Sequence, residues 1–197
     1  MNAPQDPQPA MPYLTEEQIH AMRFRFAGTG VRISTRCAIY DAERISVGHR
    51  SRIDDFCILS GEVTIGDHCH ITPQCLLAGG RPGIELADFC TLAYGVKIFA
   101  QSDDYSGESM TNSTVPREFK REIFARVRLK RHVIVGANSC ILPGVTVEEG
   151  CSVGAMSLLT RSTEPWGMYY GIPATRRRDR SRNLLNLEAQ FAGRPTE

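Results

Sequence analysis

Aliphatic residues recur at every sixth position along most of the chain. They form three runs: Val47, Ile53, Leu59, Ile65, Ile71 and Leu77; then Leu86, Leu92 and Ile98; then Leu129, Val135, Ile141, Val147, Val153 and Leu159. The residue after each aliphatic residue is often glycine, alanine or serine, and the fourth residue after it is usually small. This period predicts a parallel β-helix, because each six-residue unit buries its side chains only by stacking on neighbouring units.

The segments outside this period predict other elements. The start of the chain is rich in proline and lacks an apolar pattern, which is typical of disorder. At 197 residues the chain is long enough for one domain with a sizeable core. We expect that single domain to contain a disordered lead-in at 1–12, an N-terminal helix at 13–30, the β-helix at 31–165, and a C-terminal turn and helix at 166–197.

The N-terminal helix has a recognisable start and an apolar face. Thr15 and Gln18 have the spacing of a capping box. Ile19, Met22 and Phe26 are spaced to lie on one side of a helix. Two glycines follow this stretch and are expected to end the helix.

The period is interrupted by a long insertion between Ile98 and Leu129. If the repeat begun at Ile98 runs to Asp103, the insertion covers residues 104–128. Loops longer than about 12–15 residues in a compact domain are usually functional or disordered. Because this one mixes aromatic and charged residues, we expect it to project from the shaft and reach a neighbouring subunit or a substrate.

Seven cysteines raise the possibility of disulfides or a zinc site, but their spacing argues against both. No CxxC pair exists and the total is odd. Six of them occupy the small inward position of the repeat, where a thiol acts as a small apolar group. We expect these six to be reduced and buried: Cys37, Cys57, Cys69, Cys75, Cys90 and Cys151.

Charge and hydropathy narrow the partners of the chain. The formal net charge is +1, so no overall field favours nucleic acid or an anionic membrane. No apolar stretch approaches the length that spans a bilayer, and the N-terminus lacks the basic and apolar pattern of a signal peptide. We therefore expect a cytoplasmic protein.

Two motifs at the end of the chain carry a family resemblance. The stretch VGANSCILPGVTV at 135–147 and the turn GIPA at 171–174 resemble the last coils and terminal turn of hexapeptide-repeat acyltransferases. The resemblance implies an all-β fold, a left-handed parallel β-helix. Within that family the chain is most similar to sugar acetyltransferases related to the galactoside, maltose and O-antigen enzymes; RIDDF at 52–56 and DDYSG at 103–107 carry that narrower likeness.

The resemblance also implies a homotrimer that binds acetyl-coenzyme A between neighbouring β-helices. Small residues would let the pantetheine arm approach the coil backbone, and guanidinium groups would hold the nucleotide phosphates. A solvated basic tail is the alternative interpretation of the arginines. The residues expected to bind the coenzyme are Gly136, Ala137, Gly154, Ala155, Ser157, Arg176, Arg177 and Arg178.

The identity of the general base stays open between two residues. The family usually has a histidine at the start of the insertion, where this chain has Asp103. A solvated carboxylate with a pKa of about 4 is a poor base for a sugar hydroxyl unless desolvation or adjacent Asp104 raises its pKa. His70 is the alternative, because it lies at a coil corner that could face a neighbour's loop. Asp54, Asp104 and Tyr105 are expected to bind the substrate.

The missing histidine favours an amine as the acceptor. An amino sugar with a pKa of about 8 is partly deprotonated at neutral pH and needs less help than a hydroxyl. We therefore favour N-acetylation of a nucleotide-linked amino sugar in polysaccharide or O-antigen biosynthesis. The alternative is O-acetylation of a sugar hydroxyl, as in the galactoside and maltose enzymes.

Three other functions fit the sequence less well. A zinc enzyme of the γ-class carbonic anhydrase type needs three converging imidazoles, which the histidine spacing does not supply, so we expect no metal. A non-catalytic scaffold would not need the long insertion or the terminal turn. A nucleotidyltransferase needs a nucleotide-binding domain, for which the stretch before Val47 is too short.

Overall fold

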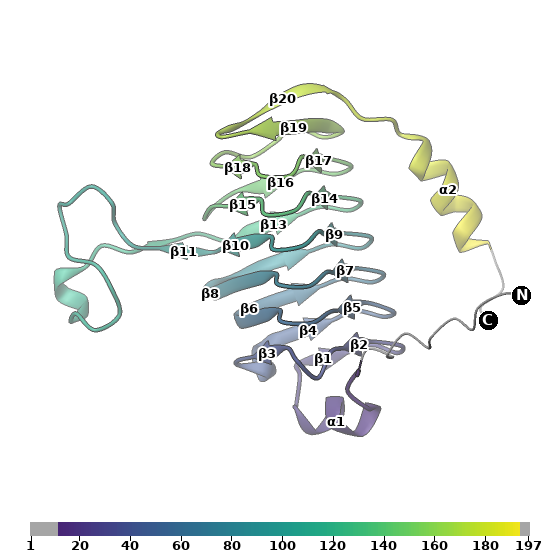
Figure 1. The fold of residues 1–197 in the computed structure, drawn as a ribbon, viewed down its shortest axis with the longest axis horizontal. Coiled ribbons are helices and arrows are strands. Elements are labelled where there is room, and N and C mark those ends of the chain that lie inside the picture. Colours follow the sequence, from purple (N-terminus) through teal and green to yellow (C-terminus); the bar gives the residue numbers. More distant parts are fainter. Residues whose placement is uncertain (1–11, 194–197) are drawn as a thin grey trace, which may run out of the picture.

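The hexad units wind into a parallel β-helix in this computed structural model, which describes residues 12–193 (Figure 1). Three walls of parallel strands enclose the core. Wall 1 contains β3 (Ala38–Ile39), β10 (Lys97–Phe99), β15 (Cys140–Ile141) and β18 (Leu158–Leu159). Wall 2 contains β1 (Phe26–Ala27), β4 (Ile45–Val47), β13 (Val127–Leu129) and β16 (Thr146–Val147). Wall 3 contains β2 (Arg32–Ile33), β5 (Arg52–Ile53), β7 (His70–Ile71), β9 (Thr91–Leu92), β14 (Ile134–Val135), β17 (Ser152–Val153) and β19 (Gly167–Gly171).

Two longer strands run through walls 1 and 2 without a break. They are β6 (Ile58–Ile65) and β8 (Leu76–Leu86), which pair in parallel. Leu77 and Leu86 are nine positions apart, three more than the six-residue period, and the three extra residues lie within β8. The register of β8 against β6 shifts next to Gly61. The irregularity is absorbed there, so the coils above it keep their stacking.

The predicted core is confirmed by burial of the hexad positions. All fifteen aliphatic residues of the three runs, from Val47 to Leu159, are at most 3% exposed. Five of the six inward cysteines are buried, Cys37 is partly buried, and all seven are free thiols. The buried thiols donate to carbonyls of the next coil, as from Cys57 Sγ to Thr72 O at 3.1 Å. The cysteines are therefore part of the coil packing, as expected.

The N-terminal helix is shorter than predicted. Helix α1 spans Glu16–Ala21 and has the complete capping box. Arg23 has a positive φ of 55°, which a right-handed helix cannot continue. The expectation that Phe26 shares the helical face is wrong, because Phe26 belongs to β1 and pairs with Ser46 on wall 2. The β-helix thus begins before residue 31, and the disorder expected for 1–12 falls, except at Pro12, outside the described residues.

The β-helix also continues beyond its predicted end at 165. Strand β19 joins wall 3, and β20 (Ala174–Asp179) turns back along it through the GIPA turn. The hexad ends at Leu159, but backbone pairing with β17 still holds one more strand. The expected C-terminal helix is present as α2 (Asn183–Ala192). No helix in residues 12–193 is both long and apolar enough to cross a bilayer.

The C-terminal segment lies along the corner between walls 2 and 3. The rings of His68, Phe89 and His132 stack on successive coils, and Phe191 of α2 meets the first two edge-on. Glu188 Oε2 lies 2.7 Å from His132 Nε2. Helix α2 is therefore held by aromatic and charged contacts to the coil corners.

The insertion is a hairpin that projects from the shaft (Figure 1). Its stem is formed by β11 (Gln101–Ser102) and β12 (Ile123–Phe124), which pair antiparallel. The tip contains a short 3₁₀ helix (Arg117–Phe119); a second such helix (Ala42–Arg44) precedes β4. Residues 127 and 128 already belong to β13. We call residues 101–124 the arm; it leaves the shaft at the corner between walls 1 and 2.

We predict that Gly150→Ala destabilises the fold more than Gly107→Ala does. Both glycines have positive φ, 68° and 85°, but a Cβ at Gly150 would lie 2.4 Å from the Trp166 ring, whereas nothing lies within 4 Å at Gly107. Each substitution costs about 1–2 kcal/mol for the left-handed backbone, and overpacking adds about 1–3 kcal/mol at Gly150. Denaturant unfolding of both variants measures the difference; equal losses would contradict it.

Candidate active site

The outer surface of wall 3 presents two rows of side chains. Backbone hydrogen bonds between coils keep each row in register, as from Asp54 N to Ile71 O and from Thr72 N to Leu92 O. The first row contains Arg32, Arg52, His70, Thr91, Ile134 and Ser152. The second row contains Ser34, Asp54, Thr72, Ala93, Gly136 and Gly154.

Asp54 is the centre of a polar cluster at the lower end of these rows. It is 2% exposed, directly follows β5, and lies between Arg52 of β5 and His70 of the next coil. His70 belongs to β7 on wall 3, so its expected place at a coil corner is wrong. Arg52 Nε is 2.6 Å from Asp54 Oδ1, and His70 Nε2 is 2.8 Å from Asp54 Oδ2. The Tyr13 hydroxyl donates to Asp54 Oδ1 at 3.3 Å, and the Tyr13 ring contacts the Arg52 guanidinium. The structure thus joins two residues that the sequence analysis singled out, His70 and Asp54.

The cluster keeps Asp54 ionised. Burial alone would raise the pKa of Asp54, but hydrogen bonds from Arg52 and His70 and the charge of Arg52 hold that pKa below its ordinary value. Burial and the neighbouring Asp54 charge raise the pKa of Tyr13, so its hydroxyl stays a donor. An imidazole beside a fixed carboxylate is a common arrangement for proton transfer at neutral pH.

One buried hydroxyl beside this cluster lacks a partner. Thr72 follows Asp54 in the second row and is 8% exposed. Its Oγ1 makes no hydrogen bond to any of the described residues. Buried polar groups are normally paired, so this hydroxyl marks a position where a water or a ligand group is needed.

The residues expected to line the coenzyme channel lie higher on the same wall. Gly136 and Gly154 occupy the second row above Ala93. A Cβ at Gly136 would lie 2.4 Å from the Ala155 nitrogen, and one at Gly154 would lie 2.0 Å from the Tyr170 ring. The glycines are thus required by the packing of the coils themselves, and coenzyme contacts at Gly136, Ala137, Gly154 and Ala155 stay predictions.

The other expected coenzyme residues differ in exposure. Ser157 is buried, and its hydroxyl accepts the Gly171 N–H at 3.1 Å. Arg176 of β20 pairs with Asp179, with 2.8 Å between Nη2 and Oδ1. Arg177 and Arg178 are exposed on the same strand. Contact with phosphates at Arg176, Arg177 and Arg178 stays a prediction, and any role of Ser157 would be exerted through the packing of its coil.

The remaining candidates lie on the arm. Asp103 Oδ2 accepts the Asn112 N–H at 3.4 Å. Asp104 accepts hydrogen bonds from Ser106 N and Ser109 Oγ, which lower its pKa and shape the loop. Asp104 is therefore held ionised next to Asp103. Tyr105 is 93% exposed and free to contact a partner.

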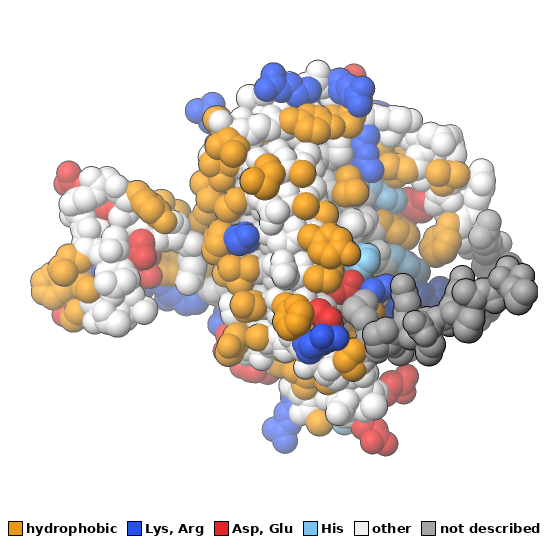
Figure 2. Space-filling view, in the orientation of Figure 1, with side chains coloured by type: hydrophobic (Ala, Val, Ile, Leu, Met, Phe, Trp, Pro, Cys, Tyr) orange, Lys and Arg blue, Asp and Glu red, His pale blue; other side chains and the backbone are white. Residues whose placement is uncertain are grey.

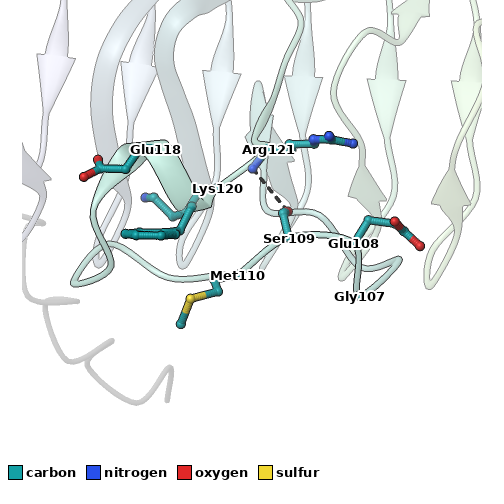
Figure 3. A pocket seen from close by; sticks show the side chains of 8 residues that line it. Gly107, Glu108, Ser109, Met110, Glu118, Lys120 and Arg121 are labelled. Atoms are coloured by element: carbon teal, nitrogen blue, oxygen red, sulfur yellow. Dashed lines mark hydrogen bonds between the residues drawn. The ribbon is translucent and has the colours of Figure 1, made fainter.

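The arm also contains a polar hollow of about 450 Å³ (Figure 3). Ser109 Oγ accepts the Arg121 N–H at 3.2 Å across it. Charged groups of both signs surround it, from Glu108, Glu118, Lys120 and Arg121, with Gly107, Met110 and Phe119 completing the lining.

The topology places the arm and the Asp54 cluster on opposite sides of one chain. The arm leaves at the corner between walls 1 and 2, and the cluster lies on wall 3, which is the wall opposite that corner. Asp103 and His70 share no hydrogen bond or ion pair in residues 12–193. The two candidate bases of one chain therefore do not form one site within that chain.

Sequence reasoning missed the roles of Arg52 and Tyr13. The signal for Arg52 was available: residues 18 apart span three hexads and stack, which puts Arg52 directly below His70. Asp54 is two positions after Arg52 and its backbone still pairs with the next coil, so the two side chains share a face. No comparable signal existed for Tyr13, which bridges to Ser34 from outside the period.

The comparisons place the chain among known acyltransferases. It is 35% identical over 184 residues to a dTDP-4-amino-4,6-dideoxy-D-glucose acyltransferase of Escherichia coli, covering 92% of this chain and 95% of that protein. It is also similar to AntD, an N-acyltransferase of Bacillus cereus, a single-site mutant of which was crystallised with dTDP-4-amino-4,6-dideoxyglucose and coenzyme A. The identity is 40% and the TM-score 0.91, with 92% of this chain and 97% of that one covered. The chain belongs to the hexapeptide-repeat acyltransferases.

A more distant structure shares the fold alone. A hexapeptide-repeat acetyltransferase of Vibrio cholerae bound to acetyl-coenzyme A shares the fold at 18% identity and a TM-score of 0.56, covering 84% of this chain and 77% of that one. No protein-family model matches the chain. The parallel β-helix expected from the resemblance is confirmed. Among residues 12–193 no group of three or more His, Cys, Asp or Glu side chains is arranged to hold a metal.

We predict that Asp54→Asn is less stable than the wild type at pH 7 by about 1–3 kcal/mol, because Arg52 loses its buried partner. The folded-state pKa of Asp54 is depressed, so its contribution is present above the unfolded pKa of about 4 and is lost as pH falls further. Urea unfolding at pH 7 and pH 3 checks this. A stability difference that does not shrink at pH 3 would contradict it.

Proposed function

We propose that this acyltransferase transfers the acetyl group of acetyl-coenzyme A to the amino group of a nucleotide-linked amino sugar. The observation that carries the proposal is the likeness, over more than nine-tenths of the chain, to two acyltransferases whose names or bound ligands specify dTDP-4-amino-4,6-dideoxyglucose. We propose further that it acts in the cytoplasm, where free thiols persist, and that its product enters polysaccharide biosynthesis.

The division of the candidate residues supports a site formed between copies of the chain. The arm projects away from its own wall 3 and so is available to a neighbour's cluster. In such an assembly Asp103 and Tyr105 of one copy would bind and orient the amine beside His70 of another. Gly136, Ala137, Gly154 and Ala155 would lie along the thioester arm, and Arg176, Arg177 and Arg178 would meet the nucleotide phosphates.

The surface of wall 1 supports an assembly of this kind. Its outward positions are mostly apolar, whereas those of wall 2, except for exposed Phe26 in β1, are polar. The wall 1 positions are Ala38, Ile58, Leu76, Lys97, Cys140 and Leu158, and those of wall 2 are Ser46, Thr64, Glu85, Arg128 and Thr146. Exposed Phe56, Tyr94 and Met156 extend the apolar surface at the adjoining corner, and apolar side chains gather along the shaft beside the arm (Figure 2). A homotrimer would cover this surface.

The proposed chemistry needs one proton acceptor. The amine nitrogen attacks the thioester carbonyl, the new C–N bond forms, and the C–S bond breaks to release the coenzyme thiolate. The nitrogen then loses a proton to the imidazole of His70, which can pass it to the thiolate. An amine is already nucleophilic when unprotonated, so Asp103 needs only to orient it.

O-acetylation of a sugar hydroxyl is a second candidate function. The His70 and Asp54 pair favours it, because a hydroxyl needs a base to become nucleophilic and an imidazole held by a carboxylate is such a base. The two functions differ in their product: an ester is cleaved by hydroxylamine and an amide is not.

We predict coenzyme thiol release when the protein is incubated with acetyl-coenzyme A and dTDP-4-amino-4,6-dideoxyglucose. The product should gain one acetyl group by mass and resist hydroxylamine. The same sugar nucleotide with a hydroxyl at C4 is the control, and 3-hydroxybutyryl-coenzyme A tests the acyl group. Loss of the added acetyl group in hydroxylamine would favour O-acetylation. No release with any amino or hydroxyl acceptor would overturn both functions.

We predict that the protein sediments as a trimer and that Leu76→Asp dissociates it. The substitution places a charge on apolar wall 1 and should lower the mass at micromolar concentration to that of one chain. Thr146→Asp, on polar wall 2 beside Arg128, is the matched control and should leave the trimer intact. A wild-type protein that sediments as a monomer would contradict the prediction.

A further inference from the structure

Asp54 is a buried carboxylate whose two oxygens have different partners. Oδ1 receives Arg52 Nε and the Tyr13 hydroxyl, at 2.6 and 3.3 Å. Among residues 12–193, Oδ2 has one partner, His70 Nε2 at 2.8 Å. The side chain of Asp54 is 3% exposed, whereas that of His70 is 39% exposed. A buried charge is therefore aimed at one ring nitrogen of a histidine whose other edge is accessible.

This arrangement selects one tautomer of the imidazole. An ionised carboxylate can only accept hydrogen bonds, so His70 Nε2 must carry the hydrogen. In a neutral imidazole the lone pair then lies on Nδ1. Nδ1 of His70 has no hydrogen-bond partner among residues 12–193, so the lone pair is left for an incoming group.

We infer that Asp54 is a positioning residue that fixes His70 as the Nε2–H tautomer, so that Nδ1 takes the proton from the acceptor. The substrate-binding role expected for Asp54 is thereby replaced, because both of its oxygens are occupied within the chain. The catalytic half of this inference rests on the proposed function. The tautomer itself does not, since it is a property of the unliganded protein.

Arg52 and Tyr13 serve the same purpose from the other side. Their hydrogen bonds occupy Oδ1 and prevent the carboxylate from rotating away from His70. Arg52 also keeps Asp54 ionised, which a donor role for Nε2 requires. Thr72, adjacent to Asp54 in the same row, adds a buried hydroxyl that has no hydrogen-bond partner within residues 12–193.

The direct test is nitrogen NMR of the five histidines in ¹⁵N-labelled full-length protein, with His70→Asn used to assign the His70 signals. In the wild type, at a pH where the ring is neutral, His70 should show a protonated Nε2 and an unprotonated Nδ1. Asp54→Asn should lose this preference, because an amide can either accept or donate. Asp55→Asn should keep it, because Asp55 is bonded to Ser34 and Arg36 instead. A wild-type mixture of tautomers, or an Nε2–H tautomer retained in Asp54→Asn, would overturn the inference.

Kinetics of the same variants test the catalytic half. Asp54→Asn should lower kcat by about 100-fold, within the usual range for general-base catalysis, and leave KM for acetyl-coenzyme A nearly unchanged. Asp55→Asn should retain wild-type kcat. A rise in KM with unchanged kcat would contradict a positioning role. If the wild type transfers no acyl group, the proposed function fails while the NMR result still decides the tautomer.

Discussion

The register of each coil on the one below it is the constraint on which the molecule depends. Backbone hydrogen bonds between coils fix this register, and inward aliphatic residues stack only when it is kept. A displacement by one residue would turn the core outward. The same register aligns the outward side chains, so that Arg52 lies below His70 and Asp54 reaches across to it. The candidate chemistry is therefore a consequence of the same stacking that forms the core.

Coil stacking also explains why the fold was predictable from the sequence. A strict six-residue period has few alternative interpretations. The aliphatic residues that recur from Val47 to Leu159 predicted both the core and the positions of the inward cysteines. The ends were less predictable, because there the period fades and pairing with a free strand edge decides the structure. Phe26 fits a helical face in sequence, yet it pairs with β4 because Arg23 has already turned the chain. Strand β19 similarly continues wall 3 beyond the last hexad.

The candidate site was only partly predictable, for a related reason. His70 and Asp54 were both proposed, but their contact depends on the side-chain geometry of two coils, which a linear pattern does not contain. Tyr13 reaches the cluster from a segment outside the repeat. The arm lies opposite wall 3 because it leaves the shaft at the corner between the other two walls, and this follows once the three-walled coil is known. Asp103 and His70, alternatives in the sequence, become complementary if one copy supplies the arm and another supplies the cluster.

The contrast between walls 1 and 2 connects this site to assembly. The apolar outer surface of wall 1 is removed from water when another copy of the chain covers it, whereas the polar surface of wall 2 would stay in water. A crystal structure of the protein with coenzyme A and dTDP-4-amino-4,6-dideoxyglucose tests the whole account most directly. The account predicts the sugar amine within hydrogen-bonding distance of His70 Nδ1 of one copy and of Asp103 from a neighbouring copy. An amine bound by residues of a single chain, out of reach of His70, would contradict it.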